Sequence, residues 1–230
     1  MSEGARPQVA VVDYGLGNLF SVKHACEHAG METVITSDGE QLLRADAVLL
    51  PGVGAFGDAM SALERLELIS VLKDLVASGK PLVGICLGMQ LLMSESVEFG
   101  RHRGLGFIEG DVVRLEESRM TSRPVKVPEV GWNRLRMPRP RHWEGSLLDG
   151  LEDGEFMYFV HSFYVRPADP SVMLSTTRYG SMDYCSSFQR RNLFACQFHP
   201  ERSGPSGLRV YRNLARQIRR AWREREVAHV

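Results

Sequence analysis

The segment Gly84-Ile85-Cys86-Leu87-Gly88 has the form Gly-x-nucleophile-x-Gly. It lies where an apolar run, predicted to be a strand over residues 81–85, meets a helix predicted to begin near Leu87. A nucleophile on such a sharp strand-to-helix turn has a strained backbone and needs small neighbours. The helix start favours a thiolate and offers the Leu87 amide to an oxyanion. The pattern therefore predicts that Cys86 is a nucleophile, with a buried structural cysteine as the alternative.

A cysteine nucleophile needs a base, and Phe198-His199-Pro200-Glu201 follows another apolar run over residues 193–198. We expect His199 to take the proton of Cys86. Pro200 stiffens the turn, so that Glu201 can reach the imidazole, fix its tautomer and stabilise the imidazolium. A surface turn without a catalytic partner is the alternative interpretation.

A third apolar run ends in Leu50-Pro51-Gly52-Val53-Gly54. Glycines at such a place let backbone amides approach a ligand closely. We therefore expect the amides of Val53 and Gly54 to complete an oxyanion hole with that of Leu87 and to contact the substrate backbone. An ordinary strand-to-helix turn is the alternative.

The positions of apolar residues predict an α/β fold, with a mixed, mainly parallel sheet flanked by helices and a strand-turn-helix nucleophile elbow. In the first half we expect strands over 8–12, 33–36, 47–50 and 81–85, and helices over 18–29, 56–66 and 69–78. In the second half we expect strands over 110–115, 130–135, 157–160, 172–177 and 193–198, and a helix over 207–227. Because parallel strands end at the same edge, the three loops should face one cleft.

The length favours a single domain over residues 1–230, with a core at about 8–215 and a basic helical tail over 216–230. Residues 136–141 (RMPRPR) are predicted to form an exposed loop that is too short to link two domains. For the arginine-rich helical stretch over residues 207–227, we favour a solvated surface helix over nucleic-acid binding.

The 28 Lys and Arg residues balance 28 Asp and Glu residues, so no overall field attracts nucleic acid or a membrane. No segment is typical of a signal peptide or a membrane span, and we expect a cytoplasmic protein. The four cysteines form no CxxC pair and no metal-ligand spacing; they are Cys26, Cys86, Cys185 and Cys196. We therefore expect free thiols and no metal, and a small molecule or another protein as partner.

Taken together, PGVGAF, GICLGMQLL and FHPE resemble the class I glutamine amidotransferases, which release ammonia from glutamine with a Cys-His-Glu triad. The segments VVDYGLGNLFSV, EVGWNRL, YFVHSFYV and QFHPERSG are similar to the glutaminase subunits of imidazole glycerol phosphate synthase in particular. The resemblance extends from Val9 to about Ala215. It implies a class I glutamine amidotransferase-like fold.

The resemblance also implies a substrate site. The positions that match the family's glutamine-binding residues are Gly54, Gln90, Glu98, His161 and Ser162. Gln90 follows Cys86 by one helical turn and should face the same side. Glu98 could accept the ammonium group of glutamine, whereas taken alone it would be a surface carboxylate. The family often has a tyrosine after the His-Ser pair, but this chain has Phe163.

The reaction implied by the resemblance is hydrolysis of L-glutamine to L-glutamate and ammonia through a thioester on Cys86, without a metal or organic cofactor. In the family, ammonia passes to a cyclase that makes imidazole glycerol phosphate in histidine biosynthesis. This chain has no second domain for that step, so the cyclase should be a separate polypeptide in a heterodimer. Asn18 and Trp132 match docking positions, with Tyr158 nearby; a core tryptophan is the alternative for Trp132.

Three other functions stay open. The chain could be the glutaminase of another synthase, a stand-alone cysteine hydrolase or peptidase, or a binding subunit that keeps only the fold. For the favoured function we expect little activity until the partner and its substrate bind, with control through the Val53 loop.

Overall fold

The computed structural model describes residues 5–116 and 125–228. In this part of the chain the main sheet has eleven strands. Five parallel strands form one half in the order β2 (Glu32–Thr36), β1 (Gln8–Val12), β3 (Ala47–Gly52), β4 (Leu82–Cys86) and β13 (Leu193–Cys196). The sheet continues, in spatial order, with β12 (Met182–Arg190), β10 (Phe163–Pro167), β7 (Ile108–Arg114), β5 (Met93–Ser96) and β6 (His102–Arg103), while β11 (Met173–Tyr179) pairs with β12.

A separate hairpin-like pair stands beside this sheet. It consists of β8 (Glu129–Arg134) and β9 (Phe156–His161), which run antiparallel with Trp132 opposite Tyr158. Two short 3₁₀ turns, η1 (Pro170–Val172) and η2 (Pro200–Arg202), follow β10 and β13.

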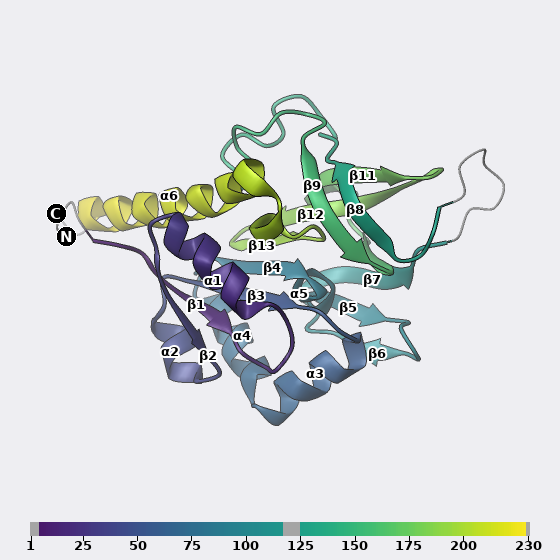
Figure 1. Ribbon diagram of the computed structural model, residues 1–230. Coiled ribbons are helices and arrows are strands. Elements are labelled where there is room, and N and C mark those ends of the chain that lie inside the picture. The colour runs from purple at the N-terminus through teal and green to yellow at the C-terminus, as the bar shows by residue number, and fades with distance from the viewer. Residues whose placement is uncertain (1–4, 117–124, 229–230) are drawn as a thin grey trace.

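Helices cover both faces of the parallel strands (Figure 1). On one side lie α1 (Leu19–His28) and α6 (Gly204–Ala228), and on the other α2 (Gly39–Arg44), α3 (Phe56–Arg65) and α4 (Leu68–Ala77). A five-residue helix, α5 (Leu87–Leu91), follows β4 directly. The mainly parallel α/β architecture predicted from the sequence is confirmed.

The core has two halves because alternate side chains of a strand point to opposite faces of the sheet. In β1, Val9 and Val11 belong to the buried cluster under α1 and α6. Ala10 and Val12 belong to the cluster under α2, α3 and α4. The central parallel strands are therefore buried on both faces, which holds their carboxyl ends rigidly side by side.

The predicted elements are all present, with ends shifted by a few residues. Among the described residues, one helix and four strands were not predicted from the sequence, namely α2, β5, β6, β10 and β12, and neither were the 3₁₀ turns η1 and η2. The predicted loop at residues 136–141 is largely exposed, as expected.

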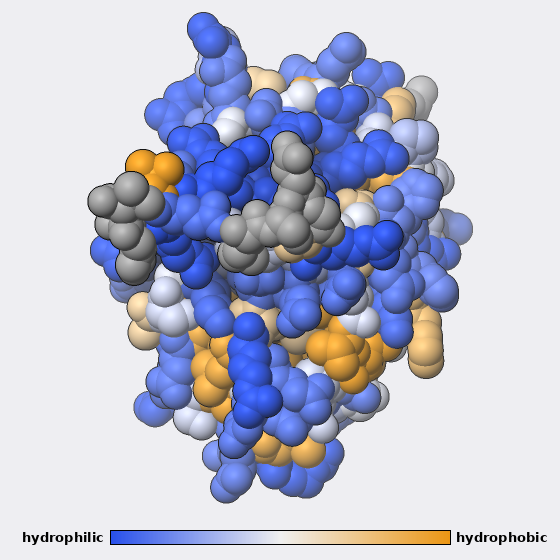
Figure 2. Space-filling model, turned by 90° about the vertical axis from the view of Figure 1, so that its left-hand side faces the viewer, coloured by the Kyte–Doolittle hydropathy of each residue, from blue (hydrophilic) through white to orange (hydrophobic). Residues whose placement is uncertain are grey.

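The long helix α6 continues through residue 215 without a break. Ile218 is still buried, and the indole nitrogen of Trp222 donates to Asp46 at 3.0 Å. Beyond them the helix is exposed, and the face of the molecule at this end is mostly hydrophilic (Figure 2). Among the described helices, none has the length and apolar character needed to cross a membrane.

Candidate active site

The nucleophile elbow has the strained conformation that the sequence predicts. Cys86 has φ 54° and ψ −109°, a backbone with positive φ that a non-glycine residue rarely adopts. A Cβ atom on Gly84 would come within 3.0 Å of the Gly88 backbone, and one on Gly88 would come within 1.7 Å of the Leu50 carbonyl oxygen. Both glycines are therefore required by close packing of backbone against backbone.

The sheet register brings the three predicted loops to one edge. In the parallel pair β3–β4, Gly52 lies opposite Cys86, and in β13–β4, Cys196 lies opposite Ile85. Val53 follows β3, Cys86 is the last residue of β4 and His199 follows β13, so all three lie at the carboxyl ends of neighbouring strands.

His199 and Glu201 form a buried pair. His199 Nδ1 and Glu201 Oε1 are 2.7 Å apart, and their side chains are 6% and 2% exposed. Burial lowers the pKa of His199, but the negative charge and hydrogen bonding of the Cys86 sulfur, followed by Glu201, outweigh it and raise the pKa to about 10. The protonated imidazole of His199 is thus favoured at neutral pH.

Backbone contacts fix the loop that carries His199. The His199 amide donates to the Tyr158 carbonyl at 2.9 Å, and the Ser203 hydroxyl donates to the His199 carbonyl at 2.7 Å. The same hydroxyl accepts from the Tyr158 amide at 3.0 Å. The base is therefore tied to β9, the strand that also carries Tyr158.

A cavity of about 250 Å³ opens beside the nucleophile. Its walls include Cys86 and all five residues predicted to bind the substrate, namely Gly54, Gln90, Glu98, His161 and Ser162. The volume suits a molecule of amino-acid size. A larger hollow of about 350 Å³ lies between β1, β2 and α2, but the described residues that line it include no cysteine or histidine.

The predicted oxyanion loop is exposed toward the cavity. Val53 is 50% exposed, and Gly54 has φ 141°, so a larger residue at position 54 would be strained. Beneath the loop, the hydroxyl of Tyr14 donates to the Pro51 carbonyl at 2.7 Å. A Cβ on Gly52 would lie 2.0 Å from that hydroxyl oxygen, which explains the glycine there.

Glu98 has a second contact that was not predicted from the sequence. One carboxylate oxygen accepts a hydrogen bond of 2.6 Å from the backbone amide of Phe56, the first residue of α3. The N-cap residue Ala55 makes no side-chain cap, so Glu98 satisfies an amide at the start of the helix. Glu98 is buried here rather than lying on the surface.

His161 belongs to a buried polar network. Its Nδ1 is 2.9 Å from the Phe163 carbonyl, which can only accept, so Nδ1 carries a hydrogen. Its Nε2 is 3.2 Å from the Tyr184 hydroxyl, which donates to Glu129 at 3.0 Å. Burial, and then the Glu129 charge, raises the pKa of Tyr184 well above its usual value, so this hydroxyl remains a donor.

The predicted docking residues Trp132 and Tyr158 lie together. Trp132 is 55% exposed, and its ring centroid is 6.1 Å from that of Tyr158. The Tyr158 ring is in turn 6.5 Å from the His199 ring, and the guanidinium carbon of Arg202 lies 4.4 Å above it. The exposed Trp132 and the buried His199 are thus separated by one side chain.

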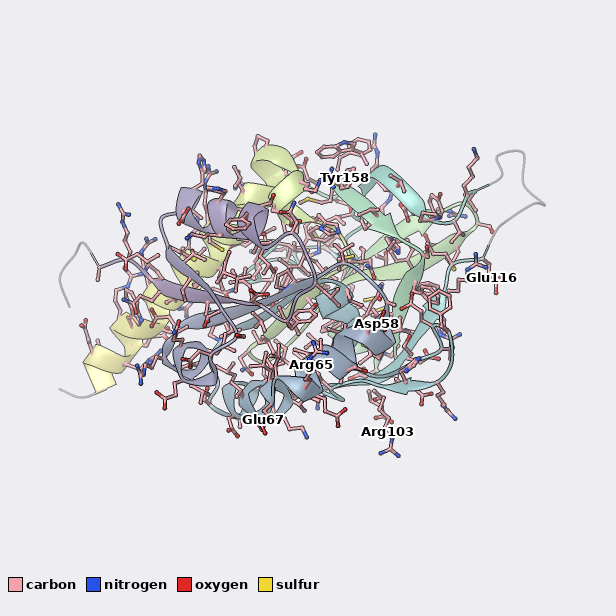
Figure 3. The ribbon with its side chains drawn as sticks, turned by 60° about the horizontal axis from the view of Figure 1, so that its bottom comes forward. Asp58, Arg65, Glu67, Arg103, Glu116 and Tyr158 are labelled. Atoms are coloured by element: carbon pink, nitrogen blue, oxygen red, sulfur yellow. The ribbon has the colours of Figure 1, made fainter. Side chains whose placement is uncertain are left out.

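Tyr158 lies on the β8–β9 side of the molecule, away from Asp58 and Arg65 of α3 (Figure 3). Asn18, the third predicted docking residue, is exposed and caps α1, because its side chain accepts from the Ser21 amide at 3.3 Å. This contact gives Asn18 a structural role besides any docking.

The other three cysteines are free and buried. Burial raises the pKa of Cys26 to about 12, and it also raises the pKa of Cys185 and of Cys196 above the usual range. They therefore stay protonated and unreactive. No group of His, Cys, Asp and Glu side chains suited to a metal occurs among the described residues.

Comparison with known proteins identifies the family. The family model "Glutamine amidotransferase class-I" matches residues 10–218. Imidazole glycerol phosphate synthase subunit HisH from Aquifex aeolicus is 46% identical over 211 residues, which are 91% of this chain and 97% of that protein. The chain belongs to the HisH family of class I glutamine amidotransferases. The HisH subunit of Rhodopirellula baltica is also 46% identical, over 90% of this chain and 96% of its own.

Solved structures support the fold of this HisH-family chain. A putative GMP synthase protein from Thermoplasma acidophilum has a TM-score of 0.70 at 20% identity, and the match covers 96% of this chain and 98% of the other. PurLQS from Thermotoga maritima has a TM-score of 0.69 at 21% identity, over 93% and 100% of the two chains. At such identities the likeness concerns the fold alone.

Two buried residues that contact the site were given no role from the sequence. Gln197, which is fully buried, donates from its amide to the Cys86 sulfur at 3.5 Å. Glu129, which is 3% exposed, accepts hydrogen bonds from the Tyr184 hydroxyl and, at 2.8 Å, from the side-chain amide of Asn133. Both lie in segments quoted for the family resemblance, but nothing in a single sequence tells which side chains of a motif turn inward.

Proposed function

We propose that this chain hydrolyses L-glutamine to L-glutamate and ammonia with Cys86, His199 and Glu201 as its catalytic triad. The Cys86 thiolate attacks the side-chain amide carbon. His199 gives its proton to the leaving nitrogen, so that ammonia departs and a glutamyl thioester remains. His199 then takes a proton from water, the hydroxide attacks the thioester, and the thiolate leaves as glutamate forms.

The observation that carries this proposal is the environment of His199. Its Nδ1 lies 2.7 Å from a carboxylate oxygen of Glu201, and the negative charges of Cys86 and Glu201 raise its pKa to about 10. A thiolate and imidazolium pair supplies both the nucleophile and the acid that the first step needs. Glu201 holds the imidazole in place through Nδ1.

Negative charge on the amide oxygen would be stabilised by backbone amides. Leu87 begins α5 directly after Cys86, and Val53 and Gly54 line the same cavity. We propose that these donors form the oxyanion hole. Because Val53 is half exposed on a glycine-flanked loop, this part of the hole is the one that a partner could rearrange.

The substrate's amino-acid group would bind in the rest of the cavity. Glu98 supplies a carboxylate for the ammonium group, while Gly54, Gln90, His161 and Ser162 supply polar groups around it. Only one oxygen of Glu98 is engaged by the Phe56 amide at 2.6 Å, so the other can face the ligand.

We also propose that the ammonia passes to a separate cyclase polypeptide, as the subunit names of the HisH relatives suggest. The docking surface would include Trp132, Tyr158 and Asn18. A partner that moves Trp132 would act on Tyr158 and, through it, on the backbone that holds His199. Such a contact path is suited to a glutaminase that becomes active only when its partner binds.

The test is glutamate release from glutamine by the pure protein, alone and with the cyclase and its ribotide substrate. We expect a large rise with the partner, loss of activity in Cys86→Ala, and near-normal activity in Cys26→Ala, whose thiol is buried in α1. Activity that persists in Cys86→Ala would refute the triad, and activity independent of the partner would refute the coupling.

A further inference from the structure

Gln197 occupies an unusual place for an uncharged amide. It lies between β13 and His199 and is fully buried, and its side chain contacts the nucleophile directly. It does not line the substrate cavity. The side-chain amide therefore reaches neither solvent nor a bound substrate, and its hydrogen bonds go only to other residues of the active site.

The orientation of this amide is fixed by a chain of hydrogen bonds that begins at a backbone carbonyl. The Phe163 carbonyl can only accept, so the group of Gln90 that faces it at 3.0 Å is the nitrogen. The same nitrogen donates to Gln197 Oε1 at 3.2 Å. The oxygen of Gln197 therefore faces Gln90, and its nitrogen faces the Cys86 sulfur at 3.5 Å.

The opposite orientation of Gln197 is unfavourable on both sides. It would place two amide nitrogens against each other at Gln90, and it would place an amide oxygen against the sulfur. Since none of these groups is exposed to solvent beyond a few per cent, water cannot relieve either contact. The chain from Phe163 through Gln90 thus directs an N–H group at the nucleophile.

We propose that Gln197 is a further catalytic residue, whose side-chain N–H stabilises the Cys86 thiolate before attack and again when the thiolate leaves the thioester. A hydrogen bond to an ionised group is stronger than one to a neutral group. The bond therefore strengthens as the sulfur gains negative charge and weakens in the thioester. His199 supplies the proton-transfer group, whereas Gln197 supplies a donor that never ionises.

This proposal rests on the nucleophilic role of Cys86 and predicts a reactivity change that glutamine binding does not influence. The experiment measures the rate of Cys86 alkylation by iodoacetamide against pH in the wild type and in Gln197→Met, which keeps the length of the side chain but donates nothing. We expect the midpoint of the profile to rise by about one pH unit, so that the alkylation rate at any pH below the wild-type midpoint falls about tenfold.

Two controls separate this effect from damage to the fold. Gln189→Met changes a glutamine of β12 that no hydrogen bond joins to the described residues of the site, and should leave the profile unchanged. In Gln197→Met, the limiting rate at high pH should match or exceed that of the wild type, and the buried Cys26, Cys185 and Cys196 should remain unlabelled. A disrupted fold would expose those three thiols.

Steady-state kinetics with the cyclase complex add a second measurement. Gln197→Met should lower kcat about tenfold at a pH below the wild-type midpoint of the alkylation profile, with KM nearly unchanged because Gln197 lies outside the cavity. Gln90→Met should raise KM as well, because Gln90 lines the cavity. An alkylation profile of Gln197→Met that coincides with the wild type would overturn the proposal. Full glutaminase activity after alkylation of wild-type Cys86 would instead overturn the triad.

Discussion

Gly88→Ala tests the packing that holds together the two halves of the proposed oxyanion hole. The new Cβ would lie 1.7 Å from the Leu50 carbonyl oxygen, whereas such contacts essentially never fall below 3.0 Å. Leu50 is held in β3 between two parallel neighbours, so the start of α5 must retreat from β3 by about 1 Å or more. A misplacement of this size costs about a hundredfold in rate, and the overpacking costs about 1–3 kcal/mol of stability.

The assay compares two reactions of the same thiol. Glutamine hydrolysis builds an oxyanion that needs the Leu87 and Val53 amides, whereas alkylation by iodoacetamide displaces iodide and builds none. We therefore expect kcat of Gly88→Ala in the cyclase complex to fall about a hundredfold, while the alkylation rate of Cys86 changes by less than about threefold. Thermal unfolding should show the loss of stability.

Gly39→Ala is the matched control. Its Cβ would meet a methyl group of the Val71 side chain at 2.8 Å rather than backbone, and Gly39 does not line the cavity beside Cys86. This variant should keep its kcat. A Gly88→Ala protein with wild-type kcat, or one that loses alkylation and hydrolysis in equal measure, would refute the reasoning.

Three further predictions concern single contacts. Because the pKa of His199 is raised from 6.5 to about 10, the protonated imidazole stabilises the fold fully below pH 6.5, and this contribution is lost as the pH approaches 10. In urea unfolding across this window, the free energy of unfolding should decrease less steeply with pH for His199→Gln than for the wild type. Glu98→Gln keeps an oxygen for the Phe56 amide but loses the charge, so KM for glutamine should rise about tenfold or more with α3 intact; unchanged KM would contradict the ammonium contact. Trp132→Ala should weaken cyclase binding about tenfold or more, measured by calorimetry, with little change in the melting temperature of the free chain, and equal affinity would exclude a docking role.

The parallel half of the fold could be predicted because its signals are local. Each central strand is an uninterrupted apolar run, since both faces are buried, and glycines mark the turns that follow. The elbow was predictable for the same reason: Gly84 and Gly88 flank the nucleophile within one short segment, and their packing follows from the turn itself.

The antiparallel half was harder because its core contains polar residues. Ser186 and Ser187 of β12 are fully buried, and their hydroxyls satisfy that of Ser175 of β11 at 2.9 and 2.6 Å. In a single sequence, a run of serines does not predict a core strand. The five-residue β10 and the six-residue α2 are likewise too short to show a clear period.

The polar contacts of the site depend on residues far apart in the chain. Gln197 reaches Cys86 across 111 positions and Gln90 across 107. Each residue type is compatible with many positions, and only the parallel pairing of β13 with β4 brings them together. For this reason the motifs could suggest the proposed triad, but not the amide donor that contacts the Cys86 sulfur.

The most direct test of the triad is to label the complex with a diazoketone analogue of glutamine, which binds as the substrate does and alkylates the attacking thiol. We predict one label for each chain, located on Cys86 by peptide mass spectrometry, with loss of glutaminase activity in proportion and protection by glutamine. Labelling of Cys26, Cys185 or Cys196, or labelled Cys86 with activity retained, would contradict the proposed mechanism.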